Sequence, residues 1–216
     1  MNLFSNFKII IQLRLIHFAL MIFPMGCNGQ VEPASSLMVR DVPDGFGKGT
    51  VLGSIDLICD SLQLAHLENG FDSLQIRFWF RYVGQLNQQL ISISYAKKEW
   101  KATYCEFTPI LDDKDSLVSF QKKIMGIKPR HSFNMIIDSL DHLGIWSIED
   151  RSKIVNYPDV HNTDQVTIEI SSMKMYRLFQ HSDLEEVSKK LTNVAMVRRM
   201  VQLLLSEFNI KLIRSM

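Results

Sequence analysis

The sequence predicts an α+β domain with a mainly antiparallel sheet, built from a four-strand meander plus a hairpin, and with two helices packed on one face. Two observations lead to this fold class. Apolar residues alternate with other residues in several short runs, which short polar links separate. The apolar spacing changes to the helical period after residue 130, and again near the C-terminus. Strands and helices that are segregated in this way indicate an antiparallel sheet with its helices on one side.

The clearest strand signal lies at residues 74–82, where apolar and other residues alternate and aromatic residues are frequent. The apolar row consists of Leu74, Ile76, Phe78, Phe80 and Tyr82, and the alternate row of Gln75, Arg77, Trp79 and Arg81. Three more strands are predicted at 90–96, from about Trp100, and at 117–129. The links between them, a polar loop at 84–89 and an acidic turn at 111–116, are short, and this predicts the meander.

The next elements are a helix and a hairpin. Apolar residues recur at helical spacing within residues 130–146, with Ser132 as the expected N-cap and Gly144 as the stop. Residues 165–180 predict two short strands that turn around Ser171–Ser172.

The last element is predicted as one long helix over residues 181–208. Ser182 and Glu185 have the spacing of a capping box at its start. One apolar stripe then follows the helical period and consists of Val187, Leu191, Val194, Val201, Leu204 and Phe208.

The N-terminus is typical of a secretory signal peptide. Lys8 and Arg14 precede an apolar run at Leu15–Met25, and the small residue Gly26 ends it. A retained signal-anchor and a buried core helix are the alternatives. The apolar run is short for a hydrocarbon core about 30 Å thick, and it has no polar face. We therefore predict export to the cell envelope, with a periplasmic or secreted soluble form as the alternative localisation.

Cys27 follows the expected cleavage point directly. The pair Gly26–Cys27 resembles the lipobox of bacterial lipoproteins, although Pro24 and Met25 depart from its usual pattern. The resemblance implies a diacylglycerol on the Cys27 thiol and a third acyl chain on its amine, and two or more chains anchor stably. A cysteine beside the cleavage point by chance is the alternative. The predicted boundaries are a signal peptide at 1–26, a flexible tether at 27–50 and a single α+β domain at 51–216.

Composition excludes several classes of protein. The chain has 46% hydrophobic and 22% charged residues and a net charge of +1, so neither disorder nor strong attraction to nucleic acid is expected. Cys59 and Cys105 could form a disulfide after export or remain two separate buried thiols. No Cys-x-x-Cys spacing indicates a zinc site.

No motif of catalysis or cofactor binding is present. The sequence lacks a Gly-x-Ser-x-Gly elbow, and its glycine-rich stretch at 45–50 lacks the spacing of a nucleotide-binding loop. We therefore expect no catalytic residue, no cofactor and no metal. Two weaker groups are an acid/His pair one helical turn apart, Asp138 and His142 with Asp141 beside it, and a loop with Asp159, His161 and Asp164. An ordinary polar surface is the alternative for both.

The best candidate for a binding surface is the alternate row of the first strand. Arg77, Trp79 and Arg81 can stack on a planar or sugar ligand and bind a carboxylate. Trp100 and Tyr104 are expected on the same face. In the alternative interpretation a helix covers this face and the arginines pair with acids.

Four segments together resemble a family of uncharacterised bacterial envelope lipoproteins. They are "ENGFDSLQIRFWF", "NYPDVHNTDQVTIEI", "MYR" and the C-terminal helix, within residues 67–210. The resemblance implies export and an α+β domain, and it assigns no active site. We expect a lipid-anchored envelope protein that binds a protein or a glycan, or takes part in assembly, without catalysis. A hydrolase with the scattered acid/His site is the alternative.

Overall fold

The computed structural model describes residues 38–43, 51–113, 117–160 and 163–212. These residues belong to one compact unit. The expected signal peptide at 1–26, Cys27 and the glycine-rich stretch at 45–50 lie outside the described residues.

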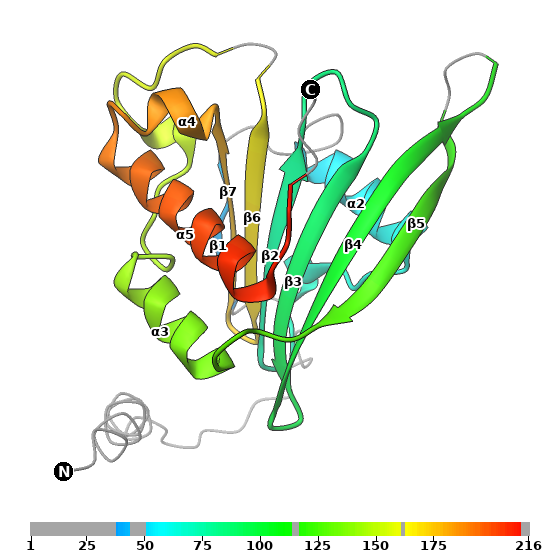
Figure 1. Ribbon diagram of the computed structural model, residues 1–216, viewed down its shortest axis with the longest axis horizontal. Coiled ribbons are helices and arrows are strands. Elements are labelled where there is room, and N and C mark those ends of the chain that lie inside the picture. The colour runs from blue at the N-terminus through cyan, green and yellow to red at the C-terminus, as the bar shows by residue number, and fades with distance from the viewer. Residues whose placement is uncertain (1–37, 44–50, 114–116, 161–162, 213–216) are drawn as a thin grey trace, which may run out of the picture. The chain divides into compact units, whose positions relative to one another are not determined.

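The described residues contain a seven-stranded mixed sheet (Figure 1). Its strands, in spatial order, are β1 (Val39–Asp41), β7 (Met175–Ser182), β6 (Gln165–Ser172), β2 (Leu74–Arg81), β3 (Gln88–Ala96), β4 (Glu99–Leu111) and β5 (Leu117–Ile127). Strand β1 pairs with β7 in parallel, and the other neighbouring strands pair antiparallel. The predicted α+β class is confirmed, and the sheet is mainly antiparallel with one parallel pair at its edge.

Strand β1 lies within the segment that the sequence predicts as a tether. The Val39 amide donates to the Lys174 carbonyl at 2.9 Å. The Asp41 carboxylate accepts hydrogen bonds from Lys153 Nζ at 2.6 Å and from Arg177 Nε at 2.8 Å. The predicted start of the domain at residue 51 is therefore wrong. Three residues are too few to show a period, so the sequence carried no signal for this strand.

Helices cover both faces of the sheet, not one as predicted. The α-helices are α2 (Val51–Leu62), α3 (Phe133–His142), α4 (Leu184–Val187) and α5 (Thr192–Phe208), with short 3-10 turns η2 (Leu67–Asn69) and η3 (Arg151–Lys153). Helices α3 and α5 pack on one face and α2 on the other (Figure 1). Within the part of the chain that the structure describes, no helix is long and apolar enough to cross a membrane.

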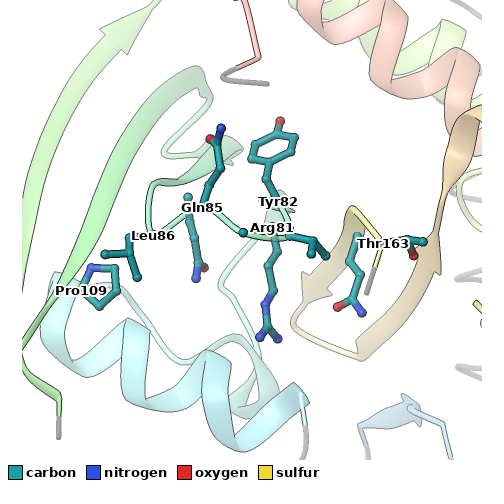
Figure 2. Close-up of a pocket in the computed structure, with 10 residues that line it drawn as sticks. Arg81, Tyr82, Gln85, Leu86, Pro109 and Thr163 are labelled. Carbon is teal, nitrogen blue, oxygen red and sulfur yellow. The ribbon is translucent and has the colours of Figure 1, made fainter. Parts of the chain in front are cut away.

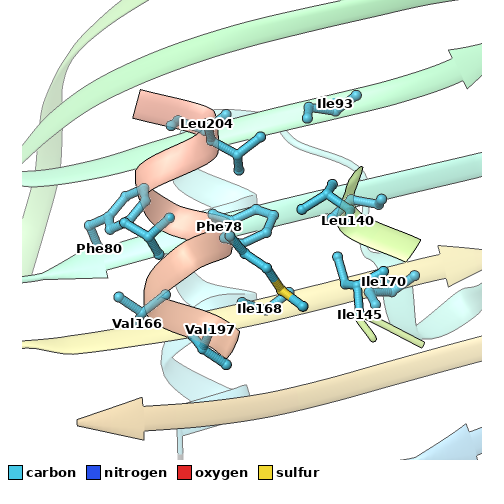
Figure 3. Close-up of a cluster of buried hydrophobic side chains, with 14 of the residues drawn as sticks. Phe78, Phe80, Ile93, Leu140, Ile145, Val166, Ile168, Ile170, Val197 and Leu204 are labelled. Atoms are coloured by element: carbon cyan, nitrogen blue, oxygen red, sulfur yellow. The ribbon is translucent and has the colours of Figure 1, made fainter. Parts of the chain in front are cut away.

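The larger core lies between the sheet and helices α3 and α5 (Figure 3). The apolar row of β2 faces these helices. Phe78 of this row and its cross-strand partner Ile168, on the neighbouring strand β6, are completely buried. The helices contribute Leu140, Val197 and Leu204, which are also buried. Burial of each such side chain stabilises the fold by roughly 1.5–3 kcal/mol. Because the alternation along β2 puts its apolar row on one face, that face becomes part of this core.

A second, smaller core lies beneath α2. Ile55, Cys59 and Leu62 of this helix are buried against the opposite face of the sheet. There Trp79 meets Phe107 edge to face, with ring centroids 6.2 Å apart. The spacing of the three helical residues is regular, but the apolar Leu57 between them is exposed. This additional apolar residue hid the helical period in the sequence.

The ends of the helices agree with the predictions in part. Ser132 caps α3 as predicted, because its side chain accepts a hydrogen bond from the Met135 amide. Gly144 follows the helix at φ +78°. The prediction of a capping box at the start of the last helix is wrong. Ser182 ends strand β7, and Asp183 at φ +48° caps the short α4 instead.

Candidate functional site

Arg77 and Trp79, two of the three residues of the predicted binding surface, lie inside the molecule. Only 1% of Arg77 and 6% of Trp79 is exposed, because α2 and the segment after it cover this face of the sheet. For these two residues the alternative interpretation is correct, because a helix covers the face on which they lie. Arg81, the third residue, is exposed. The predicted exposed row is therefore wrong for Arg77 and Trp79, and of the three residues Arg81 alone is exposed.

Arg77 belongs to a buried polar cluster centred on Glu169. Its Nη1 atom lies 3.6 Å from Glu169 Oε2, and its Nη2 atom donates to the Ala65 carbonyl at 2.8 Å. Trp79 Nε1 donates to Glu169 Oε2 at 2.7 Å, and the Tyr176 hydroxyl donates to Oε1 at 3.1 Å. Burial raises the pKa of Glu169, while the Arg77 charge opposes this shift. Glu169 is 1% exposed, and the cluster holds the Ala65 segment against the sheet.

Trp100 and Tyr104 do not share the face of Trp79. Cross-strand pairing places Trp79 opposite Leu90 and, one strand further, Cys105, so the neighbouring Tyr104 points to the other face. Both aromatic residues pack with the core under α3 and α5. Their predicted position is therefore wrong.

Cys59 and Cys105 are both buried free thiols, and no disulfide joins them. Burial raises the pKa of Cys59 to about 12 and that of Cys105 to about 11. Thiols protonated to this extent are poor nucleophiles. Of the two possibilities that the sequence left open, the structure has the separate buried thiols.

The two weaker groups of candidate residues have separate positions. Asp138, Asp141 and His142 are exposed on α3. In the loop, His161 lies outside the described residues and Asp159 is exposed, whereas Asp164 Oδ1 accepts a hydrogen bond from the Val83 amide at 3.2 Å. Asp164 thus stabilises the turn after β2. The hydrolase alternative remains a prediction.

An open cavity of about 520 Å³ lies at the end of β2, beside the turn that leads to β3 (Figure 2). It is lined by Arg81, Tyr82, Val83, Gly84, Gln85, Leu86, Gln88, Pro109, Thr163 and Gln165. These described lining residues include no carboxylate, imidazole or thiol. Figure 2 shows Arg81 between Leu86 and Pro109 on one side and Thr163 on the other.

Hydrogen-bond donors gather at this cavity because strands β2 and β6 pair there. Gln165 is the cross-strand partner of Arg81, so both side chains project on the same face. Gln180 Nε2 donates to Gln165 Oε1 at 2.9 Å, which leaves the Gln165 amide nitrogen as a donor for a ligand. Thr163 Oγ1 is buried and has no hydrogen-bond partner among the described residues. The cavity can therefore bind an anionic or hydroxyl-bearing ligand.

The sequence indicated Arg81 but missed the other residues of this site. Gln165 lies far from Arg81 in the sequence, and only the strand pairing brings the two residues together. No local pattern contains that information.

The comparisons with known proteins add no family to this description. The chain matches no family model and no curated protein. What the described residues establish is an α+β domain with a mixed sheet, helices on both faces and an open polar cavity.

Proposed function

We propose that this chain is an exported envelope protein, anchored to the membrane by lipid on Cys27, that acts by binding and not by catalysis. The N-terminal sequence and the resemblance to envelope lipoproteins support the anchor. The observation that carries the binding function is the lining of the cavity, which offers a cation and amide donors and, among its described residues, no carboxylate, imidazole or thiol.

The ligand that fits this lining best is an acidic oligosaccharide. A guanidinium such as that of Arg81 binds a carboxylate through two parallel hydrogen bonds. The amides of Gln165 and Gln88 suit sugar hydroxyls, and the apolar side chains of Leu86 and Pro109 suit the C–H face of a sugar ring. Leu86 is 59% exposed, so this apolar surface is accessible.

The test is isothermal titration of the full chain, purified in detergent, with trigalacturonic acid. We expect 1:1 binding that weakens at least tenfold in Arg81→Ala, since a hydrogen bond to a charged group contributes about 1.5–3 kcal/mol. Arg199→Ala removes an exposed arginine from helix α5 and is the matched control, which should bind as the wild type does.

Neutral maltotriose separates charge recognition from general sugar binding. It should bind more weakly than the trigalacturonate, and Arg81→Ala should not change its affinity. Equal binding of the two sugars, or an Arg81→Ala variant that binds trigalacturonate normally, would contradict the proposed site.

A further inference from the structure

Three metal-ligating side chains from three adjoining segments converge outside the cavity. They are Asp56 of α2, His66 of the following loop and Glu68 of η2, and one ligand atom from each lies within 4.8 Å of the others. His66 Nδ1 is 3.2 Å from Glu68 Oε1 and 3.7 Å from Asp56 Oδ1. All three side chains are partly buried, so the group remains accessible from solvent.

The two separations from His66 Nδ1 are close to those between the ligand atoms of a tetrahedral metal site. Zinc binds imidazole nitrogen and carboxylate oxygen at about 2.0–2.2 Å, which places neighbouring ligand atoms about 3.4 Å apart. The two distances from His66 Nδ1 lie on either side of this value. Imidazole nitrogen and carboxylate oxygen are both ligand types that zinc accepts, and three protein ligands leave one position open.

The other nitrogen of His66 has the partner that a metal-bound imidazole usually has. His66 Nε2 lies 2.7 Å from Asp60 Oδ1. When Nε2 carries the proton and donates it to this carboxylate, Nδ1 presents its lone pair toward Asp56 and Glu68. A carboxylate in this outer position fixes the tautomer and the ring orientation of a ligating histidine.

One oxygen atom of the group makes no hydrogen bond to the described residues. Asp56 Oδ1 is shielded from solvent and makes no hydrogen bond among the described residues. Its distance of 3.7 Å from His66 Nδ1 is too long for a hydrogen bond. Three carboxylates, of Asp56, Asp60 and Glu68, also surround a single imidazole. A divalent cation would compensate this excess of negative charge and satisfy Asp56.

We propose that Asp56 Oδ1, His66 Nδ1 and Glu68 Oε1 bind a divalent metal ion, with zinc as the best fit and a water molecule in the fourth position. Asp60 is a positioning residue that acts through His66. The ion joins α2, which precedes Ala65 in the chain, to η2, which follows it. The carbonyl of Ala65 is the one that Arg77 binds. It therefore fastens the covering segment over the buried Arg77–Glu169 cluster. This proposal does not depend on the lipid anchor or on the ligand cavity.

The experiment is isothermal titration of the chelator-treated full chain with zinc chloride. We expect one zinc ion per chain, and at least 100-fold weaker binding in His66→Gln, Asp56→Asn and Glu68→Gln. Asp60→Asn should weaken binding by about 10–100-fold, which is the usual effect of an outer partner. Asp72→Asn removes a nearby exposed carboxylate and is the matched control with unchanged affinity.

Two further measurements on the wild-type chain are independent of how the variants fold. Cobalt(II) should give the visible absorption of a four-coordinate nitrogen–oxygen site, and zinc should displace it. The melting temperature should rise with the zinc concentration, as it does for any ligand that binds the native state. Absence of stoichiometric binding, or binding that the four site variants leave unchanged, overturns the proposal.

Discussion

His181 on β7 is completely buried, and burial lowers the pKa of its imidazole to about 4. Its ring contacts the rings of Tyr157 and Phe179, whose centroids are 5.9 and 6.3 Å away. An imidazole in unfolded chains has a pKa of about 6.5. The unfolded state therefore takes up a proton between pH 6.5 and 4 that the folded state does not, so stability falls as the pH falls through this window.

The His181→Leu variant should lose this acid sensitivity. The shift of the His181 pKa corresponds to about 3 kcal/mol of unfolding free energy lost between pH 7 and pH 4. Urea unfolding followed by circular dichroism at both pH values measures it. We expect the wild type to lose about 3 kcal/mol more than the variant over this range. Equal losses would show that the imidazole is not the group responsible.

The pair Arg77 and Glu169 marks how far single residues could be predicted. The alternation along β2 correctly separated Arg77 from the apolar row. It could not show whether the face of the sheet that carries Arg77 is exposed to solvent, because that depends on α2, a helix without a clear period in the sequence. Glu169 had no signal of its own, since its partners Arg77, Trp79 and Tyr176 come together only through strand pairing and folding.

At the scale of elements, the start of α4 depends on a strained cap. Asp183 has φ +48°, in the left-handed region that few non-glycine residues adopt, and its side chain accepts a hydrogen bond from the Glu186 amide. Its own amide donates to the Asp164 carbonyl at 2.9 Å. The turn from β7 into α4 is therefore held by a residue that can both adopt this conformation and cap the helix.

Asp183→Ala should destabilise the domain by about 1–2 kcal/mol, because alanine loses the cap and tolerates positive φ poorly. Asp183→Asn is the matched control, since asparagine caps helices and adopts this conformation readily. Its stability should stay within about 0.5 kcal/mol of the wild type. Chemical denaturation of the three proteins tests this, and an alanine variant as stable as the asparagine variant would refute the role of the cap.

The elements that the sequence predicted best are those with a local period. Strands β2 to β5 and helix α3 lie where alternation and helical spacing indicated them. Strand β1 was missed because three residues have no period, and helix α2 because an exposed leucine interrupts its stripe. The single long helix predicted at the C-terminus is in fact two helices, α4 and α5. Asp183 caps the first, and a turn after Val187 separates it from the second.

At the scale of the whole molecule, the predicted lipid on Cys27 can be tested directly. Intact mass spectrometry of the protein extracted from membranes should give a chain that begins at Cys27 and carries the mass of its acyl chains. Cys27→Ser removes only the attachment point, and this variant should appear in the soluble fraction with the same fold by circular dichroism. A native chain that still begins at Met1 without modification is the outcome that rejects the anchor.

Strand β1 bears on how this domain would sit at a bilayer. A fully extended chain advances about 3.3–3.6 Å per residue, so a span from Cys27 to residue 51 would reach about 80 Å. Because β1 begins at Val39, half as many residues separate it from Cys27, and their fully extended length is about 40 Å. If Cys27 is acylated, the domain would therefore stay close to the leaflet that holds its acyl chains. It could contact a partner on a distant surface only if that partner approached this membrane.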